Sequence, residues 1–147
     1  MSAALPPVTP MLAVRHADQA IEFYRQAFDA VERFRLTDQE GRVAHAEIEV
    51  FGGVVMLAEE FPDYNASPQT TGKTTVILSV RTPNVDVAFE RALAAGAVTV
   101  FPVKDQFYGE RSGRLLDPFG HAWILSTPIE EVAPAEMQRR FDEMQRV

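Results

Sequence analysis

The sequence predicts an α+β fold built from two consecutive β-α-β-β-β units and a C-terminal helix. Two observations lead to this prediction. The strand–helix pattern of the first half returns in the second half, and each of the two helices is followed by short segments with the composition of strands. With 147 residues, the chain has the length of one compact domain or of two fused half-size units.

The first unit opens with a short apolar strand, after which Asp18 is a candidate helix N-cap. Apolar residues then recur at helical spacing over 20–28. In the strand at 42–50, apolar residues alternate with His45, Glu47 and Glu49, so we expect the apolar set to lie under a helix and the other set to face a cup or solvent. The expected strands span 11–14, 31–37, 42–50 and 54–58, with a hairpin loop at 38–41.

The second unit repeats the first at an offset of 66 positions, which places Leu12 on Leu78 and Phe23 on Phe89. This period is too long for a solenoid repeat. Asn84 can cap the second helix, which ends at Gly96. The expected strands span 76–80, 98–101, 114–116 and 122–126, with a loop between the second and third and a turn at 117–120.

These elements predict a single domain over residues 1–147. We expect a first module at 8–60, a linker at 61–73, a second module at 74–127 and a C-terminal helix at 133–146. The last helix carries an apolar stripe of Met137, Phe141 and Met144. The simplest interpretation is that this stripe docks on the domain, and the alternative is that it docks on a second subunit.

The composition excludes several classes of function. A formal charge of −7 argues against non-specific nucleic-acid binding, which needs a basic surface. The sequence has no apolar run of membrane-spanning length and no secretory signal, so we expect no membrane partner and a cytoplasmic location. Because there is no cysteine, a disulfide framework, a thiolate nucleophile and a cysteine-based zinc site are all excluded.

Four motifs resemble those of a known family, and they follow one another along the chain in the order that the family shows. Residues 20–24 (AIEFY) and 117–121 (DPFGH) resemble glyoxalase/bleomycin-resistance modules, whereas 54–62 and 105–113 resemble the PhnB-like subgroup. From about residue 8 to its end, the chain therefore resembles the vicinal oxygen chelate superfamily, which includes glyoxalases, bleomycin resistance proteins and extradiol dioxygenases. The resemblance implies a curved eight-stranded mixed sheet that encloses a cup, with helices on its convex face, and a homodimer.

In metal-dependent members of this superfamily, His, Gln or Glu side chains hold a divalent ion at equivalent places in both modules. The resemblance transfers these positions to Thr9, Thr75, Ile124 and either Met56 or Leu57, none of which is a good ligand. We therefore expect no metal cofactor.

A substitute metal site is the alternative. His45 and Glu47 share a strand face and could contribute to it, but they would need a third ligand such as His121.

The segment 106–108, followed by Arg111 and Arg114, gathers aromatic surface and two cations in one region. Aromatic walls with a few polar groups suit a planar organic ligand, and an arginine can pair with a carboxylate or phosphonate. The alternative is that Phe107 and Tyr108 fill the cup while Arg111 forms a structural salt bridge. Trp123 and the nearby Phe119 are expected in the core, with Trp123 under a helix.

Two functions therefore remain open. The first is a protein that binds a small organic molecule in the cup without metal, and the second is a divalent-metal-dependent lyase, isomerase or dioxygenase with a rearranged site. A purely structural role, with a filled cup, is a third and weaker interpretation. The candidate ligand-binding residues are Thr9, His45, Glu47, Met56, Thr75, Phe107, Tyr108, Arg111 and Ile124.

Overall fold

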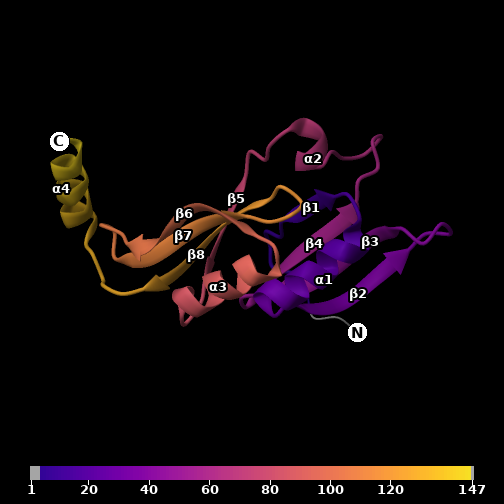
Figure 1. Ribbon diagram of the computed structural model, residues 1–147, viewed down its shortest axis with the longest axis horizontal. Coiled ribbons are helices and arrows are strands. Elements are labelled where there is room, and N and C mark those ends of the chain that lie inside the picture. Colours follow the sequence, from indigo (N-terminus) through magenta and orange to yellow (C-terminus); the bar gives the residue numbers. More distant parts are fainter. Residues whose placement is uncertain (1–3, 147) are drawn as a thin grey trace.

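The structure is a computed structural model that describes residues 4–146 of the chain, and the predicted α+β class is confirmed (Figure 1). The first module consists of β1 (Met11–Val14), α1 (Ala17–Phe28), β2 (Val31–Thr37), β3 (Val43–Val50) and β4 (Gly53–Glu59). The second consists of β5 (Ile77–Arg81), α3 (Val85–Ala95), β6 (Val98–Asp105), β7 (Glu110–Leu116) and β8 (Ala122–Pro128). A short helix, α2 (Pro68–Thr71), lies between the modules, and α4 (Pro134–Gln145) follows them.

The eight strands form two four-stranded mixed sheets with the orders β1-β4-β3-β2 and β5-β8-β7-β6. In each sheet the first strand of the module pairs in parallel with the last strand, and the other pairs are antiparallel. Helices α1 and α3 lie next to each other and pack together (Figure 1). Helix packing, rather than strand pairing, therefore brings the two modules together.

Three features differ from the predicted elements. The N-cap of α1 is His16 rather than Asp18, which lies in the first turn of the helix. The predicted linker contains a helical turn, α2, which its Ser, Thr and Gly content did not indicate. Ser67 caps this turn by accepting a hydrogen bond from the Thr70 amide, and Pro68 occupies its first turn. The strands predicted at 98–101 and 114–116 are present, but their predicted lengths were too short, because β6 and β7 extend toward each other and form a hairpin. Strand β6 continues through Pro102 because it is an edge strand, and its pairing register shifts there.

Strand β3 largely follows its predicted alternation. Ala46, Ile48 and Val50 are buried, as expected for the face under a helix, whereas Ala44 at the start of the strand is exposed. On the opposite face, Glu47 is only 5% exposed. The centre of this face is therefore shielded from solvent and is not a row of solvated polar side chains.

A buried carboxylate, Asp117, connects the two modules. Its Oδ2 atom accepts hydrogen bonds from the Tyr24 hydroxyl of α1 at 2.5 Å and from Trp123 Nε1 of β8 at 2.9 Å. Its Oδ1 atom accepts from the backbone amides of Phe119 and His121 at 2.9 and 3.0 Å. Burial, and then the charge and hydrogen bond of Asp117, raise the pKa of Tyr24 well above its usual value.

Trp123 is fully buried and packs against Tyr24 and Phe28, with ring centroids 5.6 and 4.8 Å apart. The prediction that Trp123 lies under a helix is confirmed, and that helix is α1 of the other module. The core position predicted for Phe119 is confirmed as well. His121 Nε2 lies 3.0 Å from the Ala13 carbonyl oxygen, so this side chain contacts β1 of the first module.

Helix α4 does not dock on the core as the simplest interpretation expected. It has no buried residue, and Phe141 and Met144 remain exposed. Its contacts are with the β6–β7 loop and the segment after β8: Arg140 donates to the Phe107 carbonyl at 3.0 Å and pairs with Glu130. Figure 1 shows α4 extending away from the sheets at one end of the molecule.

None of the helices described between residues 4 and 146 has both the length and the apolar composition needed to cross a membrane.

Replacing Tyr24 by phenylalanine tests the connection between the modules. Tyr24→Phe removes a buried donor to a carboxylate, so we expect the free energy of unfolding to fall by about 1.5–3 kcal/mol, measured by urea denaturation. Tyr64→Phe is the matched control, since Tyr64 is 87% exposed, and it should change stability little. Equal stabilities for wild type and Tyr24→Phe would contradict the role given to Asp117.

The pH dependence gives a second readout of the same variant. Because the pKa of Tyr24 is higher in the folded than in the unfolded state, its contribution is complete below the unfolded pKa and is lost as pH rises through the folded pKa. Wild-type stability should therefore decline above about pH 10, and more steeply than that of Tyr24→Phe.

Candidate functional site

The candidate site lies on the face of the second sheet that points away from α3, which we call the open face. Strand alternation creates it: Leu115, Trp123 and Leu125 are buried on the helix side, whereas their neighbours Arg114 and Ile124 are cross-strand partners on the other side. On the helix side α3 approaches the sheet closely. A Cβ atom added to Gly113 would lie 2.8 Å from the Phe89 ring, so glycine is needed at this point of β7.

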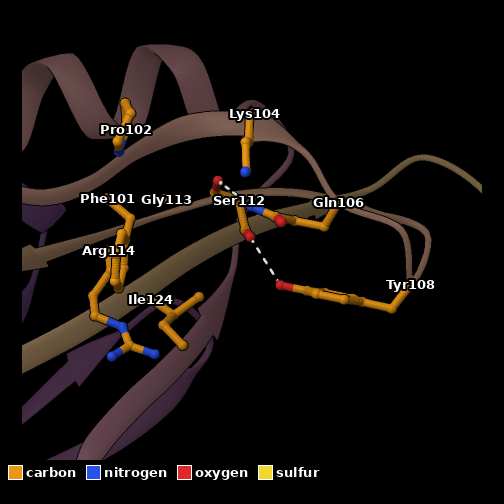
Figure 2. Close-up of a pocket in the computed structure, with 9 residues that line it drawn as sticks. All are labelled: Phe101, Pro102, Lys104, Gln106, Tyr108, Ser112, Gly113, Arg114 and Ile124. Atoms are coloured by element: carbon orange, nitrogen blue, oxygen red, sulfur yellow. Dashed lines mark hydrogen bonds between the residues drawn. The ribbon is translucent and has the colours of Figure 1, made fainter. Parts of the chain in front are cut away.

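A hollow of about 290 Å³ lies on the open face and combines apolar walls with several polar groups (Figure 2). The Tyr108 hydroxyl lies 3.1 Å from Ser112 Oγ, and Gln106 Nε2 donates to the Ser112 carbonyl at 3.3 Å. Figure 2 shows Lys104, Gln106 and Tyr108 pointing toward Ser112 from β6 and the β6–β7 loop. The lining residues are Phe101, Pro102, Lys104, Gln106, Tyr108, Ser112, Gly113, Arg114 and Ile124.

Arg114 separates this hollow from a second one of about 570 Å³ and lines both. Its guanidinium carbon lies 5.2 Å from the centroid of the Phe101 ring, in a cation–π contact. Its Nε atom is buried and has no hydrogen-bond partner among residues 4–146. The second hollow is mostly apolar on the sheet side, with Ile77 and Leu116 among its walls, and the segment after α2, including Thr75, borders it.

Arg111, three residues earlier on the same strand, lies on the helix side. Its Nε and Nη2 atoms donate to Asp86 of α3, each at 2.9 Å, and Nη1 donates to Asp105 at 3.0 Å. These hydrogen bonds raise the pKa of the Arg111 guanidinium. The geometry matches the structural salt bridge considered as the alternative from the sequence, and it places Arg111 away from both hollows.

The other second-module candidates are divided between the hollows and the loop. Tyr108 and Ile124 line the first hollow and Thr75 lines the second. Phe107 instead packs against Phe141 of α4, with ring centroids 5.7 Å apart. The segment 106–108 already included Gln106, but the sequence analysis did not single out Phe101, Lys104 or Ser112. The two-residue alternation of β7 was the one signal that could have indicated Ser112.

The first-module candidates lie on a separate sheet. Met56 pairs with Glu47 and lies on the side away from α1, whereas Leu57 is fully buried under the helix, so Met56 is the open-face residue of the two. His45 Nε2 lies 3.7 Å from Glu47 Oε2, and Arg33 Nε lies 3.6 Å from Glu47 Oε1. Thr9 donates its hydroxyl to the Pro6 carbonyl at 3.0 Å. The two hollows beside Arg114 contain none of these residues in their walls.

A divalent metal does not fit the residues present. The positions implied by the resemblance, Thr9, Met56, Thr75 and Ile124, provide no strong ligand. Within residues 4–146, no three His, Asp or Glu side chains lie close enough together to hold an ion. At the pair His45 and Glu47, the guanidinium of Arg33 already neutralises the carboxylate and would repel a cation.

Comparisons with known proteins agree with this fold. A profile of the Glyoxalase/Bleomycin resistance protein/Dioxygenase superfamily matches residues 6–125. An uncharacterized protein of Mycobacterium tuberculosis (strain ATCC 25618 / H37Rv) is 40% identical over 137 residues, which cover 90% of this chain and 81% of that protein.

Two solved structures are also similar to this chain. TioX from Micromonospora sp. ML1 is 28% identical with a TM-score of 0.69, and the match covers 86% of this chain and 100% of that one. A PhnB protein from Bacillus cereus, described as a putative 3-demethylubiquinone-9 3-methyltransferase, is 21% identical with a TM-score of 0.64, over 83% of this chain and 99% of that one. At this lower identity the second likeness concerns the fold alone.

Metal analysis tests the assessment of these ligand positions. Untagged protein, incubated with Zn²⁺, Mn²⁺, Ni²⁺ or Fe²⁺ and then freed of unbound ions, should retain far less than one metal per chain by elemental analysis. His45→Ala should give the same result, because His45 and Glu47 lack a third ligand. Near-stoichiometric metal that disappears in His45→Ala would contradict this assessment.

Proposed function

Because this chain belongs to the glyoxalase/bleomycin resistance protein/dioxygenase superfamily, we propose that it binds a small organic molecule on the open face of its second sheet, without a metal. The observation that carries the proposal is the hollow at Tyr108, Ser112 and Ile124, in which apolar walls surround a few convergent polar groups. We expect this binding to take place in the cytoplasm.

The dimensions and chemistry of the face support this proposal. The two hollows, of about 290 and 570 Å³, together fall in the size range of small-molecule sites. A purely structural role would require a filled cup, and the two hollows favour ligand binding over that role. Phe107, one of the two rings that could have filled the cup, packs against α4 instead.

We also propose that the protein forms a homodimer in which the first sheet of one copy covers the second sheet of the other. Exposed apolar side chains lie on both open faces, such as Met11 on the first and Phe101 on the second.

Such a dimer would bring His45, Glu47 and Met56 of one copy toward Tyr108 and Ile124 of the other and complete the cup. Sedimentation equilibrium should give twice the chain mass of 16.4 kDa; a monomer at tens of micromolar would contradict the proposal.

The second candidate is a metal-dependent lyase, isomerase or dioxygenase with a rearranged site. The contact between His45 and Glu47, 3.7 Å apart on the open face of the first sheet, favours it. The position of Arg33 beside Glu47 favours the metal-free proposal instead. Metal retention in wild type and His45→Ala distinguishes the two.

Filling the first hollow should abolish binding. Ile124→Trp places an indole where the half-buried Ile124 now borders the hollow, so aromatic probes should lose contact with the protein. Saturation-transfer NMR with indole, benzoate and benzamide should show signals for at least one probe with wild type and none with Ile124→Trp. Val87→Trp is the matched control, because Val87 is 63% exposed on α3, and it should leave the signals unchanged. Signals that persist in Ile124→Trp would contradict the proposed site.

A further inference from the structure

We propose that Arg114 is an anion-recognition residue and that the ligand is an organic acid, with an aromatic or otherwise apolar body and a carboxylate or phosphonate group that pairs with this guanidinium. The inference rests on the proposed function, since it concerns the same face, and it adds the chemical class of the ligand.

Arg114 has unused hydrogen-bonding capacity in a place where water has limited access. Its Nε atom is buried without an acceptor among residues 4–146, and buried donors are normally hydrogen-bonded. The arginines nearby are used differently. Arg111 is paired with Asp86 and Asp105, and Arg81, on the same open face, donates to Glu110 at 2.8 Å. No carboxylate of the described chain lies within ion-pair distance of Arg114.

The charge of the surroundings also favours an anionic ligand. Lys104 lines the same hollow and forms no ion pair with residues 4–146. The nearby carboxylates are already bound. Glu110 pairs with Arg81, and Asp117, which also lines the second hollow, accepts four hydrogen bonds. Although the chain carries a net charge of −7, this face therefore presents two cations without a matching internal anion.

The contacts around the Arg114 guanidinium leave its edge available to a ligand. Phe101 lies over one side of it, 5.2 Å from ring centroid to guanidinium carbon, and Ile124 is its cross-strand neighbour. Stacking on an aromatic ring leaves the edge of a guanidinium available, and this edge matches the two oxygens of a carboxylate or phosphonate. The apolar walls on both sides of Arg114 would take the body of the ligand, with Tyr108 and Ser112 at the far end of the first hollow.

The test compares three probes that share one ring. Isothermal titration calorimetry would measure the dissociation constants of benzoate, phenylphosphonate and the neutral benzamide. Wild type should bind the two anions about tenfold or more tightly than benzamide, as expected for a charge-assisted pair. Arg114→Gln should weaken the anions by a similar factor and leave benzamide within about twofold. Arg111→Gln, on the same strand but the opposite face, is the matched control and should leave all three unchanged.

The outcomes separate this inference from the proposed function. If benzamide binds wild type as well as benzoate does, or if Arg114→Gln binds benzoate normally, Arg114 is not an anion site while small-molecule binding still stands. If none of the three probes binds wild type, both proposals fail. Arg114→Met keeps the length and packing of the side chain, and it replaces Arg114→Gln if circular dichroism shows that the latter is unfolded.

Discussion

The structure depends on the burial of one carboxylate, that of Asp117. A buried charge is tolerated only when its oxygens are hydrogen-bonded, and both oxygens of Asp117 accept two bonds each. Two of the four donors are backbone amides of its own turn, one is Trp123 of β8 and one is Tyr24 of the other module. This saturation allows the polar ends of two large aromatic side chains to be buried, and it fixes α1 across the start of β8.

The position of α1 determines which faces of the sheets are open. Because α1 and α3 pack together, they cover the helix side of the two sheets and leave the opposite faces uncovered by them (Figure 1). Strand alternation then determines which side chains face the helices and which face the hollows. On β7, Arg111 faces α3 and becomes part of the scaffold, whereas Ser112 and Arg114 face the hollows. One sequence segment therefore supplies both a structural ion pair and the proposed ligand contacts.

Much of the fold could be predicted from patterns that act over short distances. The repeat linking Leu12 to Leu78 indicated two modules, and the alternation of β3 indicated its helix side. The structure confirms both of these, along with the place of Trp123 under a helix. The hydrogen-bond network around Asp117 could not be predicted, because the hydrogen bond between Asp117 and Tyr24 joins residues that are 93 positions apart. The burial of Glu47 was missed for a similar reason, since its neighbour Arg33 lies on another strand.

The site was predictable only in part. The composition of 106–108 and the two arginines indicated the region, and Tyr108 and Ile124 do line a hollow. Which arginine faces the hollow depends on the exact hairpin, and β6 and β7 were expected to be shorter than they are. Phe107 lies outside the hollow because it packs against Phe141 of α4, and no local sequence pattern connects that helix to this loop.

The most direct test of this account is to locate a bound ligand on the protein. Titration of benzoate into ¹⁵N-labelled protein, followed by amide chemical shifts, would show which strands respond. The account predicts the largest shifts on β7 and β8, at Ser112, Arg114 and Ile124. Shifts confined to the first sheet around His45 and Met56, with β7 and β8 unchanged, would contradict it.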